Sequence, residues 1–254
     1  MASPPETSGG ASRTKRAVVL AGGLGTRLQP YTTVLPKPLM PIGDRPVLDI
    51  VIRQLRAAAF GRVTVATGYL AELIEAFFRD GASYGVPIDY FREHEPLGTV
   101  GALALLDGLD APFLVMNGDV VTDMDYTAMF EHHVASGAAA TIASTQRHVN
   151  ITLGVMEFDD RDAPERVTSY VEKPTLSYEV SMGVYCFDPR VLAHIEAGAR
   201  LDFPDLILRL LAAGERVEAW RPEAYWLDLG RHEDYELAIA EFDEMRSRLL
   251  PDQP

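Results

Sequence analysis

Short apolar segments rich in β-branched residues alternate with amphipathic helical patterns along the first half of the chain. Four segments have the length and composition of buried parallel strands: 17–21, 63–67, 88–91 and 113–116. Apolar residues recur at helical spacing between them, over 47–59, 71–79 and 101–106. A repeated strand–helix–strand alternation predicts an α/β fold with a doubly wound sheet.

The pattern becomes mixed after Asn117. Strand-like segments cover 139–144, 153–158, 167–171 and 183–187. Helical patterns cover 126–135, 203–213 and 232–249. The last of these has acidic residues in its first turn and Arg246 and Arg248 in its last turn, as the helix dipole favours. We therefore expect one domain over 16–250 with a mixed central sheet.

The composition of the 254-residue chain, with 47% hydrophobic and 24% charged residues, suits one large domain with a buried core. No stretch approaches the roughly 20 apolar residues that cross a bilayer, and the first sixteen residues lack the apolar centre of a signal peptide. We therefore expect a cytoplasmic protein without a membrane partner. Residues 1–15, rich in Ser, Gly and Pro, are expected to form a disordered tail.

The net charge of −14 argues against a nucleic-acid partner, because binding to phosphodiesters is driven by Lys and Arg. The single cysteine, Cys186, excludes an internal disulfide and lies in an apolar segment, which predicts a buried structural thiol. The adjacent histidines His132 and His133 are expected on a solvated helix face. None of these residues is assigned a chemical role.

Only three of the 23 basic residues are lysines, and two of the three precede prolines. These two are Lys37, in Pro36-Lys37-Pro38, and Lys173, in Glu172-Lys173-Pro174. Lysine provides a compact charge on a flexible stem, which suits phosphate binding. The alternative is a chance occurrence on a solvated surface.

A glycine-rich loop follows the first expected strand directly. In the sequence Leu20-Ala21-Gly22-Gly23-Leu24-Gly25-Thr26-Arg27-Leu28, three glycines let the backbone approach an anion and present N–H groups to it. The loop is not a dinucleotide fingerprint, because Leu28 stands at the third glycine position, and no Gly-Lys-Ser/Thr of a Walker A loop follows. Considered without the rest of the sequence, the loop could equally be a structural tight turn that binds no anion.

The loop together with Pro36-Lys37-Pro38-Leu39 resembles the signature of the sugar-1-phosphate nucleotidyltransferases, the enzymes that make nucleotide sugars. The resemblance continues in family order over nearly the whole chain, through 96–99, 117–119, 172–174, 183–185 and 226–230. It implies a single Rossmann-like domain, with a nucleotide half over about 16–120, a sugar-phosphate half over about 121–230 and a C-terminal helix over 232–249. The implied partners are a nucleoside triphosphate and a sugar 1-phosphate.

The resemblance assigns catalysis to Arg27, Lys37 and Asp119, with Arg27 neutralising charge on the leaving pyrophosphate. It assigns nucleotide binding to the following residues: Leu20, Ala21, Gly22, Gly23, Gly25, Thr26, Glu93, Gly98 and Thr99. Asp119 follows a buried strand, where α/β sheets place ligands. Asp119 and Asp228, with substrate phosphates, would form a hard oxygen site for Mg²⁺.

On this interpretation no protein nucleophile is needed, because a phosphate oxygen of the sugar 1-phosphate attacks the α-phosphorus in line. The resemblance assigns the sugar phosphate to Gly154, Glu172, Lys173, Ser181 and Gly183. Ser181-Met182-Gly183 departs from the Asn-Ala-Gly of many relatives and is similar to the form in ADP-glucose pyrophosphorylases. This departure leaves the identity of the sugar open.

The segment from Glu93 to Ala102 is most similar to that of mannose and heptose 1-phosphate guanylyltransferases. A carboxylate at Glu93 can accept from N1–H and N2–H₂ of guanine together, whereas adenine has no donor at N1. The sequence therefore favours GTP. Uracil and thymine each keep one N3–H donor, so uridylyl- or thymidylyltransfer to glucose 1-phosphate is an alternative. A second alternative is that Glu93 has only a structural role in its loop.

The alternative from a different functional class is a regulatory paralogue, which binds nucleotide sugars without catalysing the reaction. Such a subunit would be expected to lose a phosphate cation or a metal carboxylate, and this chain keeps Arg27, Lys37, Asp119 and Asp228. Catalysis is therefore favoured. The sequence leaves the oligomeric state open, although members of the family commonly form homo-oligomers.

Overall fold

The computed structural model describes residues 14–93, 95–159 and 165–250. Of the tail expected at 1–15, only Thr14 and Lys15 fall within the described residues. Across these three stretches, no helix is both long enough and apolar enough to cross a membrane.

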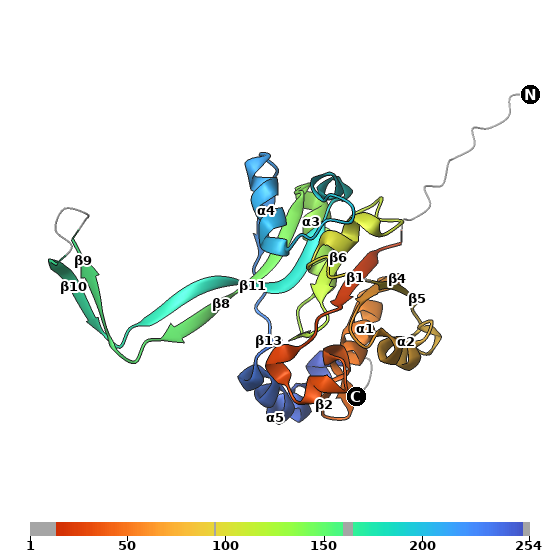
Figure 1. Ribbon diagram of the computed structural model, residues 1–254, viewed down its shortest axis with the longest axis horizontal. Helices are drawn as coiled ribbons and strands as arrows, with labels where there is room; N and C mark the ends of the chain where they lie inside the picture. The colour runs from red at the N-terminus through yellow and green to blue at the C-terminus, as the bar shows by residue number, and fades with distance from the viewer. Residues whose placement is uncertain (1–13, 94, 160–164, 251–254) are drawn as a thin grey trace, which may run out of the picture.

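A seven-stranded sheet in the order β12-β8-β11-β6-β1-β4-β5 forms the centre of the molecule (Figure 1). Its strands are β1 (Arg16–Ala21), β4 (Arg62–Thr67), β5 (Ile88–Arg92), β6 (Phe113–Asn117), β8 (Ala140–Asn150), β11 (Thr175–Phe187) and β12 (Val217–Trp220). β1 runs parallel to β4 and β6, and β4 runs parallel to β5. Because β11 is antiparallel to both β6 and β8, the sheet is mixed, and the expected Rossmann-like α/β fold is confirmed.

Helices cover both faces of this sheet: α1 (Val47–Ala57), α2 (Ala71–Phe78), α3 (Tyr126–Ser136), α4 (Phe203–Ala212), and the 3₁₀ helices η5 (Gly101–Leu105) and η6 (Pro189–His194). Alternate residues of β1 belong to different core clusters, as the two-residue period of a strand requires. Val19 packs in the cluster that includes apolar residues of α1, α2 and α3. Val18 packs in the cluster that includes residues of η5, η6 and α4.

A third cluster joins the first turn of α1 to the C-terminal helix α5 (His232–Leu249). The short strands β7 (Val120–Thr122) and β13 (Trp226–Asp228) pair beside it, as do β2 (Pro41–Ile42) and β3 (Arg45–Pro46). Phe242 of α5 is buried in this cluster with Val47 and Ile50 of α1. The cluster holds the turn after Asp228 against the glycine-rich half of the molecule.

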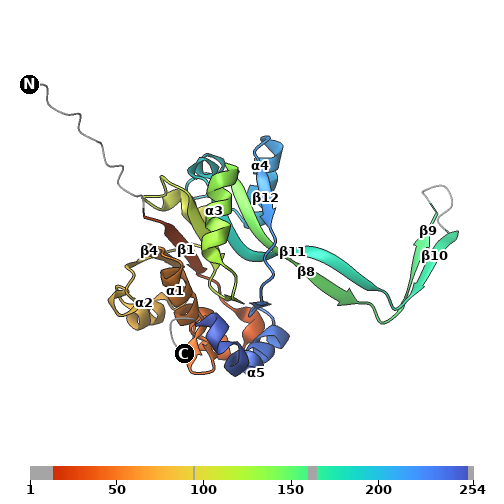
Figure 2. The ribbon, with the colours of Figure 1, turned by 180° about the vertical axis from the view of Figure 1, so that it is seen from behind.

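A two-stranded arm extends away from the body (Figures 1 and 2). The arm consists of the outer halves of β8 and β11, from Thr145 to Asn150 and from Thr175 to Val180, and of the hairpin of β9 (Gly154–Phe158) and β10 (Val167–Glu172). An irregularity in register between Ser181 and Tyr185 separates the arm from the sheet. Near its base, Arg147 forms an ion pair with Asp234 of α5, with 3.2 Å between Nη2 and Oδ1.

Some expected elements differ from the observed ones. The helix expected at 101–106 is the 3₁₀ helix η5, and the strands expected at 139–144 and 183–187 are the inner parts of the much longer β8 and β11. Most residues of their outer halves are exposed or half-buried, so these halves show no apolar alternation that would predict a strand. The histidine prediction was wrong for His133, which is 1% exposed and lies 2.8 Å from Thr141 Oγ1.

Candidate functional site

A cavity of about 680 Å³ opens at the carboxyl ends of β1, β4, β5 and β6. This is the edge at which open α/β sheets bind ligands. Every residue expected to bind the nucleotide or to act in catalysis lines it: Leu20, Ala21, Gly22, Gly23, Gly25, Thr26, Arg27, Lys37, Glu93, Gly98, Thr99 and Asp119. The cavity therefore brings together residues that lie up to a hundred positions apart in the sequence.

The glycine-rich loop reaches the cavity because its backbone packs closely against neighbouring loops. A Cβ on Gly68, which follows β4, would lie 2.9 Å from the carbonyl oxygen of Gly22. Gly25 has a φ of 62°, in the left-handed region, and begins η1 (Thr26–Leu28). Thr32 Oγ1 donates to the carbonyl of Gly25 at 2.8 Å, which fixes the turn that carries Arg27.

Three charged side chains meet at Gly230, in the turn after β13. The position that a Cβ would take on Gly230 lies 2.8 Å from Asp228 Oδ1, 2.9 Å from Lys37 Nζ and 3.6 Å from Arg27 Nη1. Lys37 also forms an ion pair with Asp119, and both side chains are largely buried. Because glycine lacks a side chain, two cations and the carboxylates share one small region beside the glycine-rich loop.

Glu93 closes the opposite side of the same cavity. Its backbone N–H donates to the carbonyl of Thr67 at 2.8 Å, which continues the pairing of β5 with β4. Its Oε2 accepts from the N–H of Leu97 at 3.3 Å, and its Oε1 lies 3.5 Å from the position of a Cβ on Gly22. Partial burial raises the pKa of the Glu93 carboxyl above its usual range, although the hydrogen bond from Leu97 opposes this shift.

Gly98 and Thr99 attach the rim of the cavity to the start of α4. Gly98 has a φ of 75°, and a Cβ there would lie 2.5 Å from the carbonyl oxygen of Leu201. The N–H of Thr99 donates to Asp202 Oδ1 at 3.0 Å, and Thr99 Oγ1 accepts from the N–H of Phe203 at 2.8 Å. Thr99 thus satisfies one of the free N–H groups at the beginning of a helix.

The residues expected to bind the sugar phosphate are not brought together. Ser181 and Gly183 lie at the base of the arm, where a Cβ on Gly183 would lie 2.7 Å from Nδ2 of Asn117, a residue that lines the cavity. Gly154, Glu172 and Lys173 lie in the arm, outside the cavity lining. The side chains of Glu172 and Lys173 are 59% and 67% exposed, and their nearest charged atoms are 3.9 Å apart.

The carboxylates of Asp119 and Asp228 fit the chemistry of a magnesium site that is completed by phosphate oxygens. Mg²⁺ in phosphoryl-transfer sites usually takes one or two protein carboxylates and keeps waters and substrate oxygens as its other ligands. Within the described residues, no group of three or more His, Cys, Asp or Glu side chains could hold a metal by protein ligands alone. Asp119 and Asp228 are the carboxylates that could contribute to a site of this kind.

Several residues of the site were missed by the sequence-based prediction. Gly68, Gly118 and Gly230 permit close backbone or side-chain approach, since a Cβ on Gly118 would lie 2.8 Å from the carbonyl of Leu20. Tyr69 and Asp202 also line the cavity. The glycines after β4, β6 and β13 were a usable signal, because each follows a strand at the ligand-binding edge of the molecule.

The sequence profile of the family described as nucleotidyl transferase matches residues 16–244. The chain belongs to this family. The match covers β1, β4, β5 and β6, at whose carboxyl ends the cavity opens, and it includes both the glycine-rich loop and the turn at Gly230.

Curated members of the nucleotidyl transferase family differ in the nucleotide that their names specify. A UTP–glucose-1-phosphate uridylyltransferase from Synechocystis sp. is 34% identical over 88% of this chain. A mannose-1-phosphate guanyltransferase from Candida albicans is 34% identical over 87% of this chain. A probable mannose-1-phosphate guanylyltransferase 1 from Oryza sativa subsp. japonica is 33% identical over 87%. The chain spans 62% of the length of each of these relatives.

Two solved structures share the fold of this chain. HddC from Yersinia pseudotuberculosis, complexed with GMP-PN, superimposes with a TM-score of 0.68 at 26% identity, over 90% of this chain and 100% of that one. A UDP-glucose pyrophosphorylase complexed with UDP-glucose gives a TM-score of 0.67 at 21% identity, over 92% of this chain and 100% of that one.

Proposed function

We propose that this nucleotidyl transferase joins a nucleoside triphosphate to a sugar 1-phosphate and releases pyrophosphate. The observation that carries this proposal is the meeting of Arg27, Lys37 and Asp228 around Gly230, beside a glycine-rich loop. Cations and carboxylates in one partly buried region can neutralise phosphates and hold a divalent ion. A site that only bound an uncharged sugar would gain nothing from this arrangement.

In this proposal the chain supplies positioning and charge rather than a nucleophile. Backbone N–H groups of the loop at Gly22 to Gly25 bind triphosphate oxygens. A phosphate oxygen of the sugar 1-phosphate forms the new bond to the α-phosphorus, and the bond to the β-phosphate oxygen breaks, so that pyrophosphate leaves in line. Arg27 and Lys37 stabilise the charge that develops on the departing pyrophosphate. Mg²⁺, held by Asp119 and Asp228, would supply further neutralisation of the phosphates.

GTP is the proposed nucleotide, because the Glu93 carboxylate lines the cavity directly beside Gly22 of the glycine-rich loop. A carboxylate matches the two adjacent donors of guanine. The names of relatives are divided between guanylyl- and uridylyltransferases, so UTP and dTTP are the alternatives that the experiment must separate.

The sugar-phosphate half is proposed to include Ser181 and Gly183 at the base of the arm, beside Asn117 of the cavity lining, and Gly154, Glu172 and Lys173 of the arm. Since the arm residues lie outside the cavity, their proposed role requires the arm to approach a nucleotide-filled site. Whether a hexose or a heptose is bound stays open. The expected cytoplasmic location and the formation of homo-oligomers stay predictions.

Pyrophosphate release should be measured with five triphosphates, each combined with mannose, glucose and heptose 1-phosphates, with Mg²⁺ and with excess chelator. We expect metal-dependent release that is fastest with GTP. If release were fastest with UTP or dTTP, the proposed nucleotide would be wrong, whereas the proposed type of reaction would still hold. Tight binding of a nucleotide sugar without turnover of any pair would favour the regulatory paralogue instead.

A further inference from the structure

Arg147, near the base of the arm, contacts the chain on both sides of the turn that carries Asp228 and Gly230. Before the turn, the guanidinium of Arg147 lies over the ring of Trp226, with 5.8 Å between Cζ and the ring centroid. After the turn, Arg147 Nη2 lies 3.2 Å from Oδ1 of Asp234, in the first turn of α5. One side chain of the arm therefore spans the segment that carries a proposed metal ligand.

The carboxylate of Asp234 depends on this contact. Asp234 is 7% exposed, and a buried carboxylate is costly unless it is paired with a cation. Arg147 donates to it from Nη1, at 3.4 Å from Oδ2, and from Nη2, at 3.2 Å from Oδ1. The Nε of Arg231 lies 3.9 Å from Oδ2, which is beyond hydrogen-bond distance. Loss of Arg147 would therefore remove the cation that is hydrogen-bonded to a buried carboxylate.

Both strands of the arm hold Trp226. Its indole N–H donates to the carbonyl of Met182, in β11, at 2.8 Å. Arg147, which lies over its ring, belongs to β8. Trp226 begins the short strand β13, in which Asp228 pairs with Val120 of β7. Because only one residue separates Trp226 from Asp228 in this strand, the position of the indole constrains that of the carboxylate.

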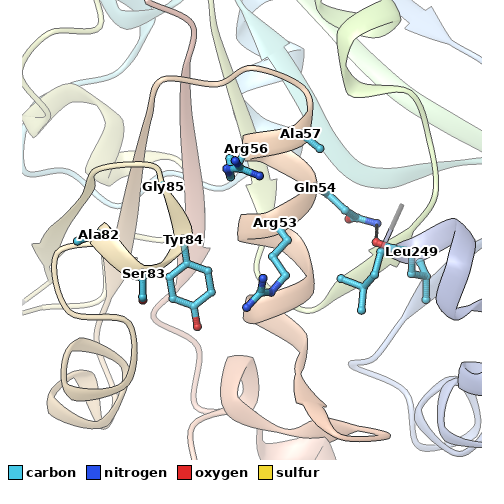
Figure 3. A pocket seen from close by; sticks show the side chains of 10 residues that line it. Arg53, Gln54, Arg56, Ala57, Ala82, Ser83, Tyr84, Gly85 and Leu249 are labelled. Atoms are coloured by element: carbon cyan, nitrogen blue, oxygen red, sulfur yellow. Dashed lines mark hydrogen bonds between the residues drawn. The ribbon is translucent and has the colours of Figure 1, made fainter. Parts of the chain in front are cut away.

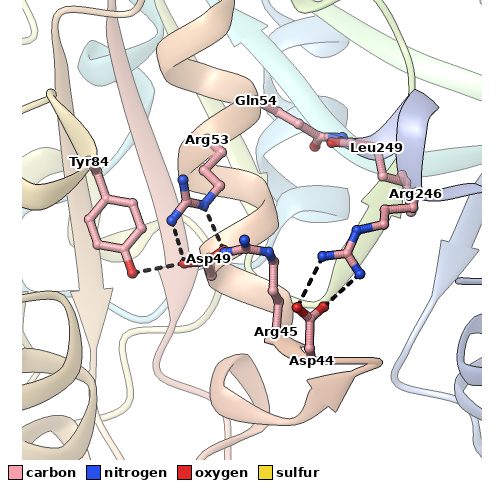
Figure 4. Close-up of polar contacts among 8 residues, drawn as sticks. All are labelled: Asp44, Arg45, Asp49, Arg53, Gln54, Tyr84, Arg246 and Leu249. Carbon is pink, nitrogen blue, oxygen red and sulfur yellow. Dashed lines mark hydrogen bonds and ion pairs between the residues drawn. The ribbon is translucent and has the colours of Figure 1, made fainter. Parts of the chain in front are cut away.

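The opposite end of α5 is fastened to α1 and to the strand pair before it. Arg246 Nη1 and Nη2 each lie 3.0 Å from a carboxylate oxygen of Asp44 (Figure 4). Gln54 Nε2 donates to the carbonyl of Leu249 at 3.0 Å, beside a cavity of about 400 Å³ between α1 and the 3₁₀ helix η4 (Ala82–Tyr84) (Figure 3). Since the body holds this end of α5, the contact with the arm acts on the first turn of the helix.

Arg147 moves with the outer half of the arm. It pairs with Tyr178 in the ladder of β8 and β11, outside the irregularity in register between Ser181 and Tyr185. The proposed function requires Lys173 of the arm to reach a sugar phosphate at the nucleotide cavity. A change in the direction of the arm at the irregularity would therefore change the contacts of Arg147 on both sides of the turn.

We propose that Arg147 is a positioning residue that couples the arm to Asp228. When a sugar 1-phosphate draws the arm towards the cavity, Arg147 shifts Trp226 and the first turn of α5, and Asp228 takes its position for the reaction. The sugar phosphate drives this shift through the contacts that it makes only with the closed arm. This inference rests on the proposed function and adds to it a link between the second substrate and a carboxylate of the metal site.

The test uses the emission of Trp226. The chain has two tryptophans, so Trp220→Phe leaves Trp226 as the only indole. The indole N–H of Trp220 is buried without a hydrogen-bond partner among the described residues, so this substitution removes no such bond. Mannose, glucose and heptose 1-phosphates are titrated in the presence of GTP, with excess chelator to stop turnover. We expect a saturable change in Trp226 emission with a sugar 1-phosphate and none with uncharged mannose.

Three further variants locate the coupling. Arg147→Met keeps most of the length of the side chain but removes its charge, so the emission change should disappear. Its kcat should fall about tenfold to a hundredfold with the nucleotide KM nearly unchanged, because Asp228 is misplaced. Arg147→Lys, which keeps a cation beside Asp234, should restore part of both. Arg221→Met, the matched control, breaks the 2.9 Å ion pair with Glu179 on the other strand of the arm and should change neither readout.

The proposal is overturned if a sugar 1-phosphate binds, as measured by calorimetry on the same protein, without any change in Trp226 emission. An equal emission change in Arg147→Met overturns it as well. Loss of stability in Arg147→Met with an unchanged kcat would show a purely structural role and has the same consequence. Failure of all three sugar 1-phosphates to bind would instead contradict the proposed function, on which the coupling rests.

Discussion

The turn at Gly230 leaves no room for even one side-chain carbon beside the charged groups of the site. A Cβ there would come within 3 Å of both Asp228 Oδ1 and Lys37 Nζ. Both neighbours are the far ends of side chains, so they can move without disturbing the backbone. Gly230 has no left-handed φ, which means that alanine is compatible with its backbone conformation.

Gly230→Ala should therefore reduce kcat/KM by about tenfold to a hundredfold, because displacement of catalytic groups by a fraction of an ångström is costly. The free energy of unfolding should change by less than about 1 kcal/mol. Steady-state kinetics and denaturant unfolding of the same preparation check both parts. Full activity in this variant would show that the charges at Gly230 do not act together.

Glu93 supplies a prediction about pH. Its pKa is raised by burial, so the carboxylate gains a proton at a higher pH than an ordinary glutamate does. The protonated group has a donor where guanine also presents donors, and GTP use should consequently fall as pH decreases through this raised pKa. In Glu93→Gln, kcat/KM should shift from GTP towards UTP or dTTP and this acidic limb should disappear. An unchanged GTP preference in Glu93→Gln would contradict the assignment of Glu93 as the residue that recognises the base.

Single residues differed in how well the sequence predicted them. Cys186 is fully buried, as its apolar neighbours predicted, and burial raises the pKa of its thiol. Asp125 accepts from the N–H of Ala128 at 2.9 Å and caps α3. The burial of His133 could not be predicted from the sequence, because it depends on Thr141 from a neighbouring strand. Gly230 could not be placed either, since its neighbours come from distant loops.

At the scale of elements, the rim of the nucleotide cavity depends on the cap that Thr99 provides for α4. Thr99→Val keeps the shape but removes the acceptor for the N–H of Phe203. It should cost about 1 kcal/mol of stability and raise the KM for the nucleotide, because the loop that carries Gly98 is no longer fixed.

Asp125→Ala is the matched control, since it removes a cap from α3, and Asp125 does not line the nucleotide cavity. It should show a similar loss of stability without any change in KM. If both variants left the nucleotide KM unchanged, Thr99 would be a structural residue only.

The helices and strands of the body could be predicted because each buries one face. The expected and observed bounds agree for 232–249 and differ by only one or two residues for the strands at Ala17 and Val63. β12 was not predicted, because it is a four-residue edge strand with no fully buried residue. In the arm, the strands expected at 153–158 and 167–171 are β9 and β10. The outer halves of β8 and β11 were not predicted, because they are solvated and their pattern does not distinguish a strand from a loop.

At the scale of the whole molecule, the distance of the arm from the nucleotide cavity is the main unexpected feature. The proposed function requires Lys173 to reach a sugar phosphate there. Lys173→Ala should then raise the KM for the sugar 1-phosphate more than tenfold and leave that for the nucleotide nearly unchanged. A distance measurement between labels at Tyr170 and at Arg62, both exposed, should shorten when both substrates bind. A constant distance together with an unchanged sugar KM would exclude the arm from the site.

The transferase proposal is tested most directly by product formation in single turnover with GTP and mannose 1-phosphate. We expect the protein to form a nucleoside diphosphate sugar and pyrophosphate in equal amounts. Arg27→Ala, Lys37→Ala and Asp228→Ala, which each remove one of the groups that meet at Gly230, should slow both products together by at least about a hundredfold. If all three variants formed product at the rate of the unsubstituted protein, the assignment of this site would be contradicted. Release of pyrophosphate without formation of a nucleotide sugar would contradict it as well.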